Sequence, residues 1–302
     1  MFRLRLSALL LIILLTACSP QRSTVVLAVL GDVMVGRGVA ATPDSFSYIA
    51  PQLKAADLSL ANLESPLSSR ADMVQPAGAA YNLCAPAGRA ALLPVWGLDM
   101  LSLANNHRLD CGPDGVAASA QALQAAGVTP LGPGFEPVDR TINGLKLAFL
   151  AFDDSLAPLD ADAAVRSIRS ARSTGALVVV MVHWGMEYQG GPSLRQESLA
   201  RQFAAAGAAL IVGAHPHVLQ RADWIAAGQG RALVFYSLGN ALFDQYGLPA
   251  TRQSALLLVT LNASGVRSVQ VLPFEIDVRA SRLVAPDGAA AARIRSLLTP
   301  QP

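Results

Sequence analysis

The chain has 302 residues, of which 52% are hydrophobic and 15% are charged, with 23 Lys and Arg against 21 Asp and Glu. This composition excludes an intrinsically disordered chain, because it provides ample apolar surface for a core. The formal net charge of +2 is nearly balanced and no stretch concentrates Lys or Arg, so nucleic-acid binding gains no support.

The first predicted element is an export signal. Arg3 and Arg5 give a basic start, residues 6–15 are apolar apart from Ser7, and Leu15-Thr16-Ala17-Cys18 supplies a small-residue cleavage site. This order predicts a secretory signal over residues 1–17. The apolar run is about half of the roughly 20 residues that a membrane-spanning helix needs.

The sequence Leu-Thr-Ala-Cys resembles the lipobox of bacterial lipoproteins, in which the cysteine becomes a diacylated N-terminus. The resemblance implies that Cys18 is lipidated and that residues 18–25 tether the domain to a membrane of the cell envelope. Ser19 after the cysteine favours the outer membrane, at its periplasmic face, in a Gram-negative cell. The alternative is an ordinary signal peptide whose cleavage site carries a cysteine.

Residues 26–302 are predicted to form a single α/β domain, because short apolar runs rich in β-branched residues alternate with helical patterns. The run 177–182 is apolar without alternation, as in a strand that is buried on both faces. Near the end, 255–261 and 266–274 have no helix between them and are expected to pair antiparallel, before a helix at 288–298. The other expected strands are 25–30, 58–62, 100–104, 146–152, 209–212 and 232–237, and the other expected helices are 46–56, 115–126, 163–172 and 194–206.

Polar side chains gather where these strands end. In open α/β sheets, ligands bind beyond the carboxyl ends of the strands, and all four histidines of the chain fall in such positions. Scattered core or surface histidines would not be sorted in this way, so we interpret the clusters as a divalent metal site. The clusters are Gly31-Asp32-Val33-Met34-Val35-Gly36-Arg37, Glu64, Asn105-Asn106-His107 with Asp110, His183-Trp184-Gly185-Met186-Glu187-Tyr188, Gly213-Ala214-His215-Pro216-His217, and Leu238-Gly239-Asn240 with Asp244.

The residue types in these clusters suit a metal. Imidazole nitrogens and carboxylate oxygens are the usual ligands of zinc, manganese and iron, and no thiolate is needed. Other roles stay open for three candidates. Asp32 is also a common turn residue, Asn106 could form an Asx-turn, and Asn62 could face inward in place of Glu64.

Two cysteines remain besides Cys18. In an exported domain a pair of thiols tends to become a disulfide, so Cys84 and Cys111 are a candidate bridge. Neither has a second Cys or His at zinc-finger spacing. The alternative is two separate buried thiols.

With these motifs assembled, the sequence resembles the bacterial CapA family of capsule and poly-γ-glutamate synthesis proteins, over about residues 26–245. The motifs that carry the resemblance are Gly31-Asp32-Val33-Met34-Val35-Gly36-Arg37, Ala61-Asn62-Leu63-Glu64-Ser65-Pro66-Leu67, Ala104-Asn105-Asn106-His107 with Asp110 and Gly112, His183-Trp184-Gly185 with Glu187-Tyr188, His215-Pro216-His217-Val218, and Ser237-Leu238-Gly239-Asn240 with Phe243-Asp244.

This family is in turn similar to the calcineurin-like metallophosphoesterases. The resemblance implies an α/β sandwich of two mixed β-sheets flanked by helices, with a site for one or two divalent ions of manganese, zinc or iron. The implied ligands are Asp32 and His217 for one ion, and Asn106, His183 and His215 for the other, with Glu64 bridging the two.

Other residues of the motifs have implied roles in catalysis. His107 would be the general acid that protonates a leaving group, and Arg37 could clamp an anionic group of the substrate bidentately. A surface salt bridge is the alternative role for Arg37. Glu187, Asn240 and Asp244 are expected to orient the metal ligands from behind or to form the rim of the site.

The sequence departs from the expected pattern at three positions. Met34 stands where the phosphoesterases usually have a histidine ligand, so the first ion could be weakly held or absent. Glu64 replaces a usual aspartate, and its extra methylene would shift the bridge. Ala214 stands where relatives often carry another histidine.

The leading hypothesis is a cell-envelope metal-dependent hydrolase that acts on a phosphoester or on a γ-glutamyl or similar polymer bond. Its expected partners are an anionic polymer or phosphoester substrate, the membrane through the N-terminal lipid, and the capsule-synthesis machinery. One alternative is a non-catalytic metal-binding or anion-binding component of polymer export or attachment. Another is a periplasmic metal carrier, in which His107 and Arg37 would be dispensable.

Overall fold

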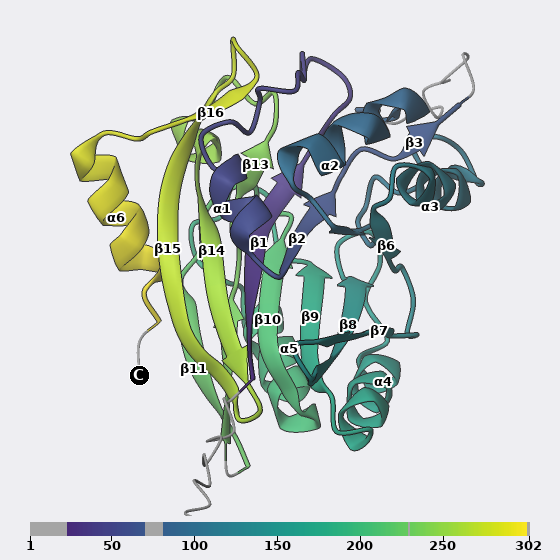
Figure 1. The fold of residues 1–302 in the computed structure, drawn as a ribbon, viewed down its shortest axis with the longest axis vertical. Coiled ribbons are helices and arrows are strands. Elements are labelled where there is room, and N and C mark those ends of the chain that lie inside the picture. The colour runs from purple at the N-terminus through teal and green to yellow at the C-terminus, as the bar shows by residue number, and fades with distance from the viewer. Residues whose placement is uncertain (1–22, 70–80, 229, 301–302) are drawn as a thin grey trace, which may run out of the picture.

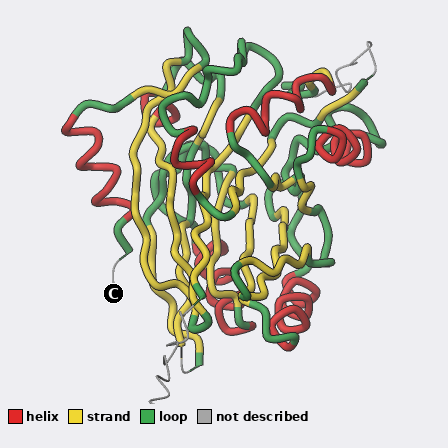
Figure 2. The backbone as a smooth tube through the Cα atoms, in the orientation of Figure 1, coloured by secondary structure: helices red, strands yellow, loops and turns green. Residues whose placement is uncertain are grey.

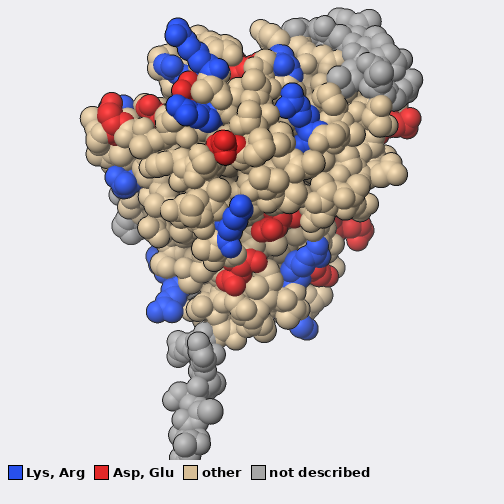
Figure 3. Space-filling view, turned by 45° about the horizontal axis from the view of Figure 1, so that its top comes forward, with Lys and Arg blue, Asp and Glu red and all other residues tan. Residues whose placement is uncertain are grey.

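The computed structural model describes residues 23–69, 81–228 and 230–300. The predicted signal, Cys18 and most of the predicted tether therefore lie outside the described residues. Within these ranges, no helix is both long and apolar enough to cross a membrane. On the face shown in Figure 3, basic and acidic side chains are interspersed, so this face offers no field of a single sign to a charged polymer.

Two mixed β-sheets stack on one another (Figure 1). The larger sheet has the order β16-β15-β14-β1-β2-β5-β6, with β13 paired to β1 in parallel, and the smaller has the order β11-β12-β10-β9-β8-β7. The strands of the larger sheet are β1 (Thr24–Val33), β2 (Leu58–Leu63), β5 (Met100–Ser102), β6 (Thr129–Leu131), β13 (Asn240–Leu242), β14 (Gln253–Asn262), β15 (Gly265–Asp277) and β16 (Arg282–Val284). Those of the smaller sheet are β7 (Val138–Ile142), β8 (Leu145–Asp153), β9 (Leu177–His183), β10 (Ala208–Ala214), β11 (Ala222–Ala227) and β12 (Gly230–Phe235).

All of the described helices except the last contribute to the outer cores of the two sheets (Figure 2). The outer core of the larger sheet packs under α1 (Ala50–Ala55), α2 (Leu92–Trp96) and α3 (Gly115–Ala125). The outer core of the smaller sheet packs under α4 (Ala161–Ser173) and α5 (Leu194–Ala206). Helix α6 (Gly288–Leu298) contacts β14 and β15 and contributes to the core between the sheets. The remaining elements are β3 (Leu67–Ser68), β4 (Ala85–Pro86), and the 3-10 turns η1 (Ala87–Ala91) and η2 (Pro249–Arg252).

Side chains that alternate along the strands form these separate cores. On β1, Val25, Leu27 and Val29 are buried between the sheets, whereas Ala28 and Leu30 join the outer core of the larger sheet. A strand that is covered on both faces must be apolar at successive positions, which is the pattern of the central strands. The arrangement confirms the two-sheet α/β sandwich that the family resemblance implied.

Most predicted strands and helices are present, with differences at their ends. The helix expected at 46–56 is only Ala50–Ala55, preceded by turns, because Pro51 in its first turn is suited to a helix start and cannot lie inside one. Helix α5 has its predicted bounds, since Ser193 and Gln196 form a capping box and Gly207 ends it at φ 110°. The strands that were not predicted are β3, β4, β6, β7, β11, β13 and β16. They are short, lie at sheet edges or do not form a continuous apolar run.

Candidate metal centre

The carboxyl ends of parallel strands from both sheets meet at one end of the sandwich. In the larger sheet Asp32 on β1 lies in register with Asn62 on β2 and Asn240 on β13. In the smaller sheet His183, the last residue of β9, lies in register with Ala214 at the end of β10. Because neighbouring parallel strands end at the same edge, side chains from distant parts of the chain are brought together there.

Two glycines permit the close backbone approach that places the ligand candidates. A Cβ on Gly31 would lie 1.9 Å from the Gly239 carbonyl oxygen, the same oxygen that accepts a hydrogen bond from the Asp32 amide. A Cβ on Gly213 would lie 2.0 Å from the carbonyl oxygen of Tyr236. Side chains at either glycine would therefore push apart the backbones that carry Asp32 and His215.

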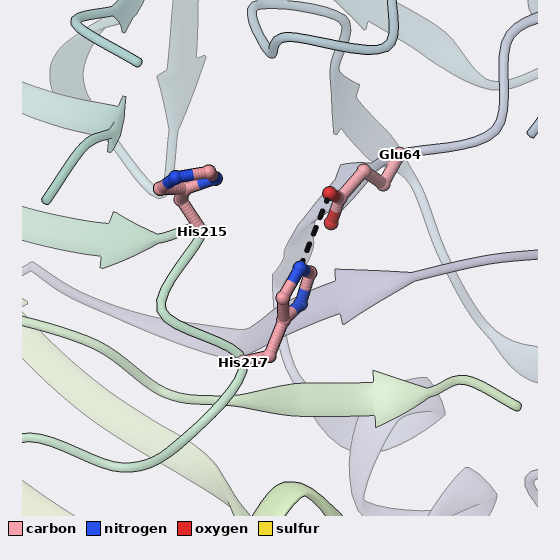
Figure 4. A group of neighbouring side chains, drawn as sticks. All are labelled: Glu64, His215 and His217. Atoms are coloured by element: carbon pink, nitrogen blue, oxygen red, sulfur yellow. Dashed lines mark ion pairs between the residues drawn. The ribbon is translucent and has the colours of Figure 1, made fainter. Parts of the chain in front are cut away.

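Glu64 lies at the centre of the cluster. Its Oε1 is 3.6 Å from Nε2 of His217, 3.8 Å from Nε2 of His183 and 3.9 Å from Nε2 of His107. Figure 4 shows the Glu64 carboxylate directed at His217, with His215 beside them. The Glu64 side chain is fully buried, and neither of its oxygens has a hydrogen-bond partner. A buried carboxylate without a partner is costly, and a divalent cation would satisfy both oxygens. The donor set therefore fits a metal ion.

Asp32 is held by neighbours on several sides. Its Oδ1 accepts a hydrogen bond from the Asn62 side chain at 2.8 Å, and its Oδ2 accepts one from the backbone amide of His215 at 3.1 Å. Oδ2 also lies 3.5 Å from Nδ1 of His217. The Asp32 carboxylate is thus oriented by hydrogen bonds toward the same space as the imidazoles.

The distances are compatible with more than one partition of the ligands between ions. Asp32, Glu64 and His183 have ligand atoms within 4.8 Å of one another, and so do Glu64, His215 and His217. Nε2 of His183 also lies 2.8 Å from Oδ1 of Asn106 and 3.1 Å from Nδ1 of His215. These three residues are the ligands that the resemblance implied for one of the two ions. Glu64 belongs to both metal-ligand groups, as expected of a bridge. The six predicted ligands therefore converge.

Amide side chains behind the ligands form a network that the sequence identified only in part. Oδ1 of Asn240 accepts a hydrogen bond from His217 Nδ1 at 2.9 Å, and the amide nitrogen of Asn62 lies 3.3 Å from His183 Nδ1. Asn105 was not assigned a role, yet it is buried and donates to the side chain of Asn62 and to the backbone of Leu63. Its position directly before Asn106 and His107 was the available signal.

His107 is oriented for proton transfer by Asp110. Its Nδ1 lies 2.8 Å from Oδ2 of Asp110, and that oxygen also accepts a hydrogen bond from the backbone amide of Leu83 at 2.7 Å. Because an ionised carboxylate can only accept hydrogen bonds, this contact places a hydrogen on Nδ1 of His107. The other ring nitrogen, Nε2, faces Glu64 and the adjacent pocket. Sequence reasoning placed Asp110 in the motif but gave it no role.

A disulfide joins Cys84 to Cys111 and ties the His107 loop to the segment before β4. The two Cα atoms are 5.1 Å apart and the residues are 27 positions apart in the sequence. Of the two alternatives for these thiols, the structure has the bridge. It lies next to the Asp110–Leu83 hydrogen bond, so both hold the same loop in place.

Removing the disulfide should destabilise the protein. We expect Cys84→Ser to lower the free energy of unfolding by about 3–4 kcal/mol, because a bridge closing a loop of this size restricts the unfolded chain by roughly that amount. Denaturant unfolding of the oxidised wild type and the variant measures it. Cys111→Ser should lose the same amount, and the double variant no more than either. Equal midpoints for the wild type and the variants would contradict the expectation.

A pocket of about 370 Å³ opens beside the metal ligands. Its wall includes His107, His217, Arg37, Glu187 and Tyr188. Tyr81, Leu83, Phe243, Asp244, Gln245 and Tyr246 complete the wall. The pocket therefore gives a substrate access to the predicted proton donor and to a predicted metal ligand at once.

Two residues of this pocket, Arg37 and Asp244, form an ion pair with each other, which is the alternative role that the sequence left open for Arg37. Arg37 donates from Nε to Asp244 at 2.8 Å and is further paired with it through a terminal guanidinium nitrogen, so its guanidinium fork is occupied by protein. Asp244 accordingly holds Arg37 and the Gly38 amide rather than orienting a metal ligand. Glu187 lies in the pocket wall, the rim position that was one of its two predicted places.

Backbone strain concentrates around the site. His215, His217, Arg37 and Tyr188 have φ values of 96°, 59°, 47° and 62°, in the left-handed region that favours glycine. Such conformations cost roughly 1–3 kcal/mol each and persist where the surrounding structure imposes them, which is common at functional sites. The motif residues are therefore held in conformations that lower the stability of the fold.

Met34, at the position where the family resemblance implied a histidine in related enzymes, is part of a hydrophobic core. Its side chain is fully buried in the outer core of the larger sheet, among the residues beneath α1 and α2. The position is therefore apolar and supplies no imidazole. Any ion on the Asp32 side would be held by the remaining groups.

The ionisable ligands shift one another's protonation. Burial raises the pKa of Glu64 well above its ordinary value, and burial lowers the pKa of His183 well below its own. Burial alone would lower the pKa of His217, but the Glu64 carboxylate and the Asp32 hydrogen bond outweigh it and raise that pKa to about 9. Without a metal, the buried Glu64–His217 pair therefore retains a proton near neutral pH.

Metal affinity should consequently increase with pH. A metal ion requires the carboxylate and the neutral imidazole, so binding must release the proton held by Glu64 and His217. Between about pH 6 and pH 9 we expect the affinity for Mn²⁺ or Zn²⁺ to rise up to tenfold per pH unit for each released proton. Calorimetric titration in buffers of different ionisation enthalpy counts that proton. An affinity independent of pH across this window would be incompatible with a protonated pair.

Comparisons with known proteins identify related sequences and a related fold. The model of the family "Bacterial capsule synthesis protein PGA_cap" matches residues 26–245. The capsule biosynthesis protein CapA of Bacillus anthracis is 33% identical over 286 residues, covering 85% of this chain and 68% of that protein. The PGA biosynthesis protein CapA of Bacillus subtilis is 32% identical over 272 residues, covering 82% and 70%.

Among solved structures, a hypothetical protein from Thermus thermophilus superposes with a TM-score of 0.50 at 18% identity. The match covers 83% of this chain and 99% of that one. At this level of identity the similarity supports the fold alone.

Proposed function

The chain belongs to the bacterial capsule synthesis protein family, and from that membership we propose that it is a metal-dependent hydrolase of the cell envelope. Its proposed substrate carries a phosphoester or a polymer amide bond. The observation that supports the proposal most strongly is Glu64, a buried carboxylate with no hydrogen-bond partner and three imidazoles within 3.9 Å.

The residues that would hold the metal are the converging carboxylates and imidazoles. Asp32, Glu64, Asn106, His183, His215 and His217 form this set. A bound divalent ion supplies Lewis acidity, which polarises a phosphoryl or acyl group and makes water more acidic. The protein contributes orientation, because Asn62, Asn105 and Asn240 fix the directions of the ligands.

His107 supplies the second requirement of hydrolysis, a proton for the leaving group. With Nδ1 hydrogen-bonded to Asp110, its Nε2 faces the pocket and can donate a proton to an oxygen or nitrogen that departs from the substrate. Asp110 keeps the ring in one orientation, as the third member of a catalytic triad does. A metal carrier would not need this proton donor.

A second candidate function is a non-catalytic metal-binding or anion-binding component of polymer export. The contact that favours its metal-binding form is the Arg37–Asp244 pair, because the guanidinium is already occupied and does not clamp a substrate anion. Turnover of an aryl phosphodiester and an aryl phosphomonoester, with Mn²⁺, Zn²⁺ or Fe²⁺ supplied to metal-free protein, distinguishes the two. The hydrolase requires metal-dependent turnover of at least one, whereas metal binding without any turnover supports the export component.

We also propose that the protein is a lipoprotein that acts with other capsule-synthesis components at the membrane. Support comes from the Leu15-Thr16-Ala17-Cys18 motif. In the native host, Cys18→Ala should leave the precursor unacylated and uncleaved by the lipoprotein peptidase. Labelling with a fatty-acid analogue and mass measurement test this, with Cys84→Ser as the matched control that keeps its label. A wild-type protein that fractionates with soluble proteins would refute the anchor.

A further inference from the structure

A second, apolar pocket of about 410 Å³ lies next to the metal-site pocket. Its aliphatic walls are Val218, Leu219, Leu248, Ile294 and Leu297, which come from the loop after β10, the η2 region and helix α6. Leu248 and Leu297 leave 40% and 38% of their surfaces exposed. Large apolar side chains that remain exposed around a hollow favour a ligand with apolar surface.

The two pockets are adjacent and share Tyr188 in their walls. This side chain lines both of them and is 47% exposed, and its hydroxyl accepts a hydrogen bond from Gln245 in the metal-site pocket at 3.1 Å. Successive residues of the chain also line the two pockets, because His217 lines the metal-site pocket and Val218 lines the apolar one. A ligand in the apolar pocket would therefore extend toward the metal ligands.

The charge of the apolar pocket limits which ligands it accepts. Of the described residues in its wall, Arg293 on α6 alone is charged, and its guanidinium has no ion pair with a described carboxylate. No acidic side chain lines the pocket in the described part of the chain. The pocket therefore suits a largely uncharged chain, because its single cation can pair with one anionic group but cannot compensate the repeated charges of a glutamate polymer.

We propose that the apolar pocket is a substrate subsite for an aliphatic chain, so that the substrate is an amphiphile. Its anionic phosphoester or similar head would lie at the metal ligands, and its chain would pass Tyr188 to lie against Val218, Leu219 and Leu297. This inference rests on the proposed hydrolase only for the head group. The binding of the chain stands on the apolar walls and on the Tyr188 side chain that they share with the metal-site pocket.

A homologous series of n-alkyl phosphates tests the subsite without requiring hydrolysis. Methyl, butyl, octyl and dodecyl phosphate are titrated, below their critical micelle concentrations, into the metal-loaded full-length protein. We expect the affinity to increase about three- to fourfold for each methylene that is buried, and then to level off when the pocket is full. Equal affinity for methyl and dodecyl phosphate would overturn the subsite.

Two matched substitutions localise the effect. Leu297→Glu places a carboxylate in the apolar wall and should remove most of the gain of dodecyl over methyl phosphate, with methyl phosphate affinity unchanged. Leu194→Glu is the control, since Leu194 on α5 is 83% exposed and lines neither pocket. If Leu297→Glu does not fold, Tyr188→Ala, which removes a side chain that lines both pockets, should still reduce the gain of dodecyl over methyl phosphate.

The outcomes separate this proposal from the proposed hydrolase. A chain-length gain that Leu297→Glu removes, in a protein that turns over no ester, supports the subsite and rejects the hydrolase. Turnover of aryl phosphates with no chain-length gain rejects the subsite and leaves the hydrolase. An equal loss of dodecyl phosphate affinity in Leu297→Glu and Leu194→Glu would also overturn the subsite, because binding would then be non-specific.

Discussion

The double variant His215→Ala/His217→Ala is expected to lose its divalent metal. Two of the predicted ligands disappear, and the Glu64 carboxylate loses the imidazole that lies 3.6 Å away. Disturbing a single outer-shell contact already costs about 10–100-fold in metal affinity, so removal of two ligands should cost at least about a hundredfold. Elemental analysis of purified wild type and double variant, after equilibration with Mn²⁺ or Zn²⁺, measures the loss.

The matched control for this loss is His107→Ala. It removes an imidazole from the same pocket, but one that belongs to neither of the metal-ligand groups that share Glu64. The control should keep the wild-type metal content, and circular dichroism should show that all three proteins are folded. Equal metal content in the wild type and the double variant would end the assignment of the site.

The second large effect is expected for His107→Gln in turnover. Glutamine keeps a polar side chain of similar reach but cannot donate a proton from a titrating group, so kcat should fall by about 10²–10⁴ while the metal stays bound. For an aryl phosphate with a very good leaving group, kcat should fall less, because the departure of that group needs little protonation. The comparison of two leaving groups under metal saturation measures this difference.

The Asp110→Asn variant tests whether the orientation of the His107 ring matters for proton transfer. The variant should keep a side chain of the same shape beside His107 Nδ1 but hold the ring less firmly. We therefore expect kcat to fall by about 10–100-fold and the pH–rate profile to shift. If His107→Gln turned over both leaving groups as fast as the wild type, His107 would have no part in catalysis, and the export component would become the better proposal.

The candidate site was predictable from the sequence because the central strands have a local sequence signal. An unbroken apolar run such as the one in β9 indicates a strand that is buried on both faces, and His183 follows it directly. The same logic found Asp32, Glu64, Asn106, His107, His215 and His217, since each stands at or just after a recognisable strand. The family motifs then supplied the order of the ligands, and the structure brings them together.

Other parts of the fold carried no such local signal. Strand β7, at the edge of the smaller sheet, has the sequence VDRTI with apolar residues only at its two ends. Strand β13 has only three residues and pairs with β1, which lies far away in the sequence. Edge and bridging strands depend on a partner rather than on their own composition. Sequence patterns therefore identified the central strands and missed those at the margins.

The sequence by itself determined the central strands, the family, and which residue types could bind a metal. Only the tertiary structure decided which side chains contact one another. Asp244 binds Arg37 across 207 positions of the chain, the Leu83 amide holds Asp110, and Tyr188 lines two pockets. Such contacts arise from the stacking of two sheets, which places residues side by side without regard to their distance in the chain. Strand periodicity is a local property, whereas the partner of a side chain is set by the packing of the whole fold.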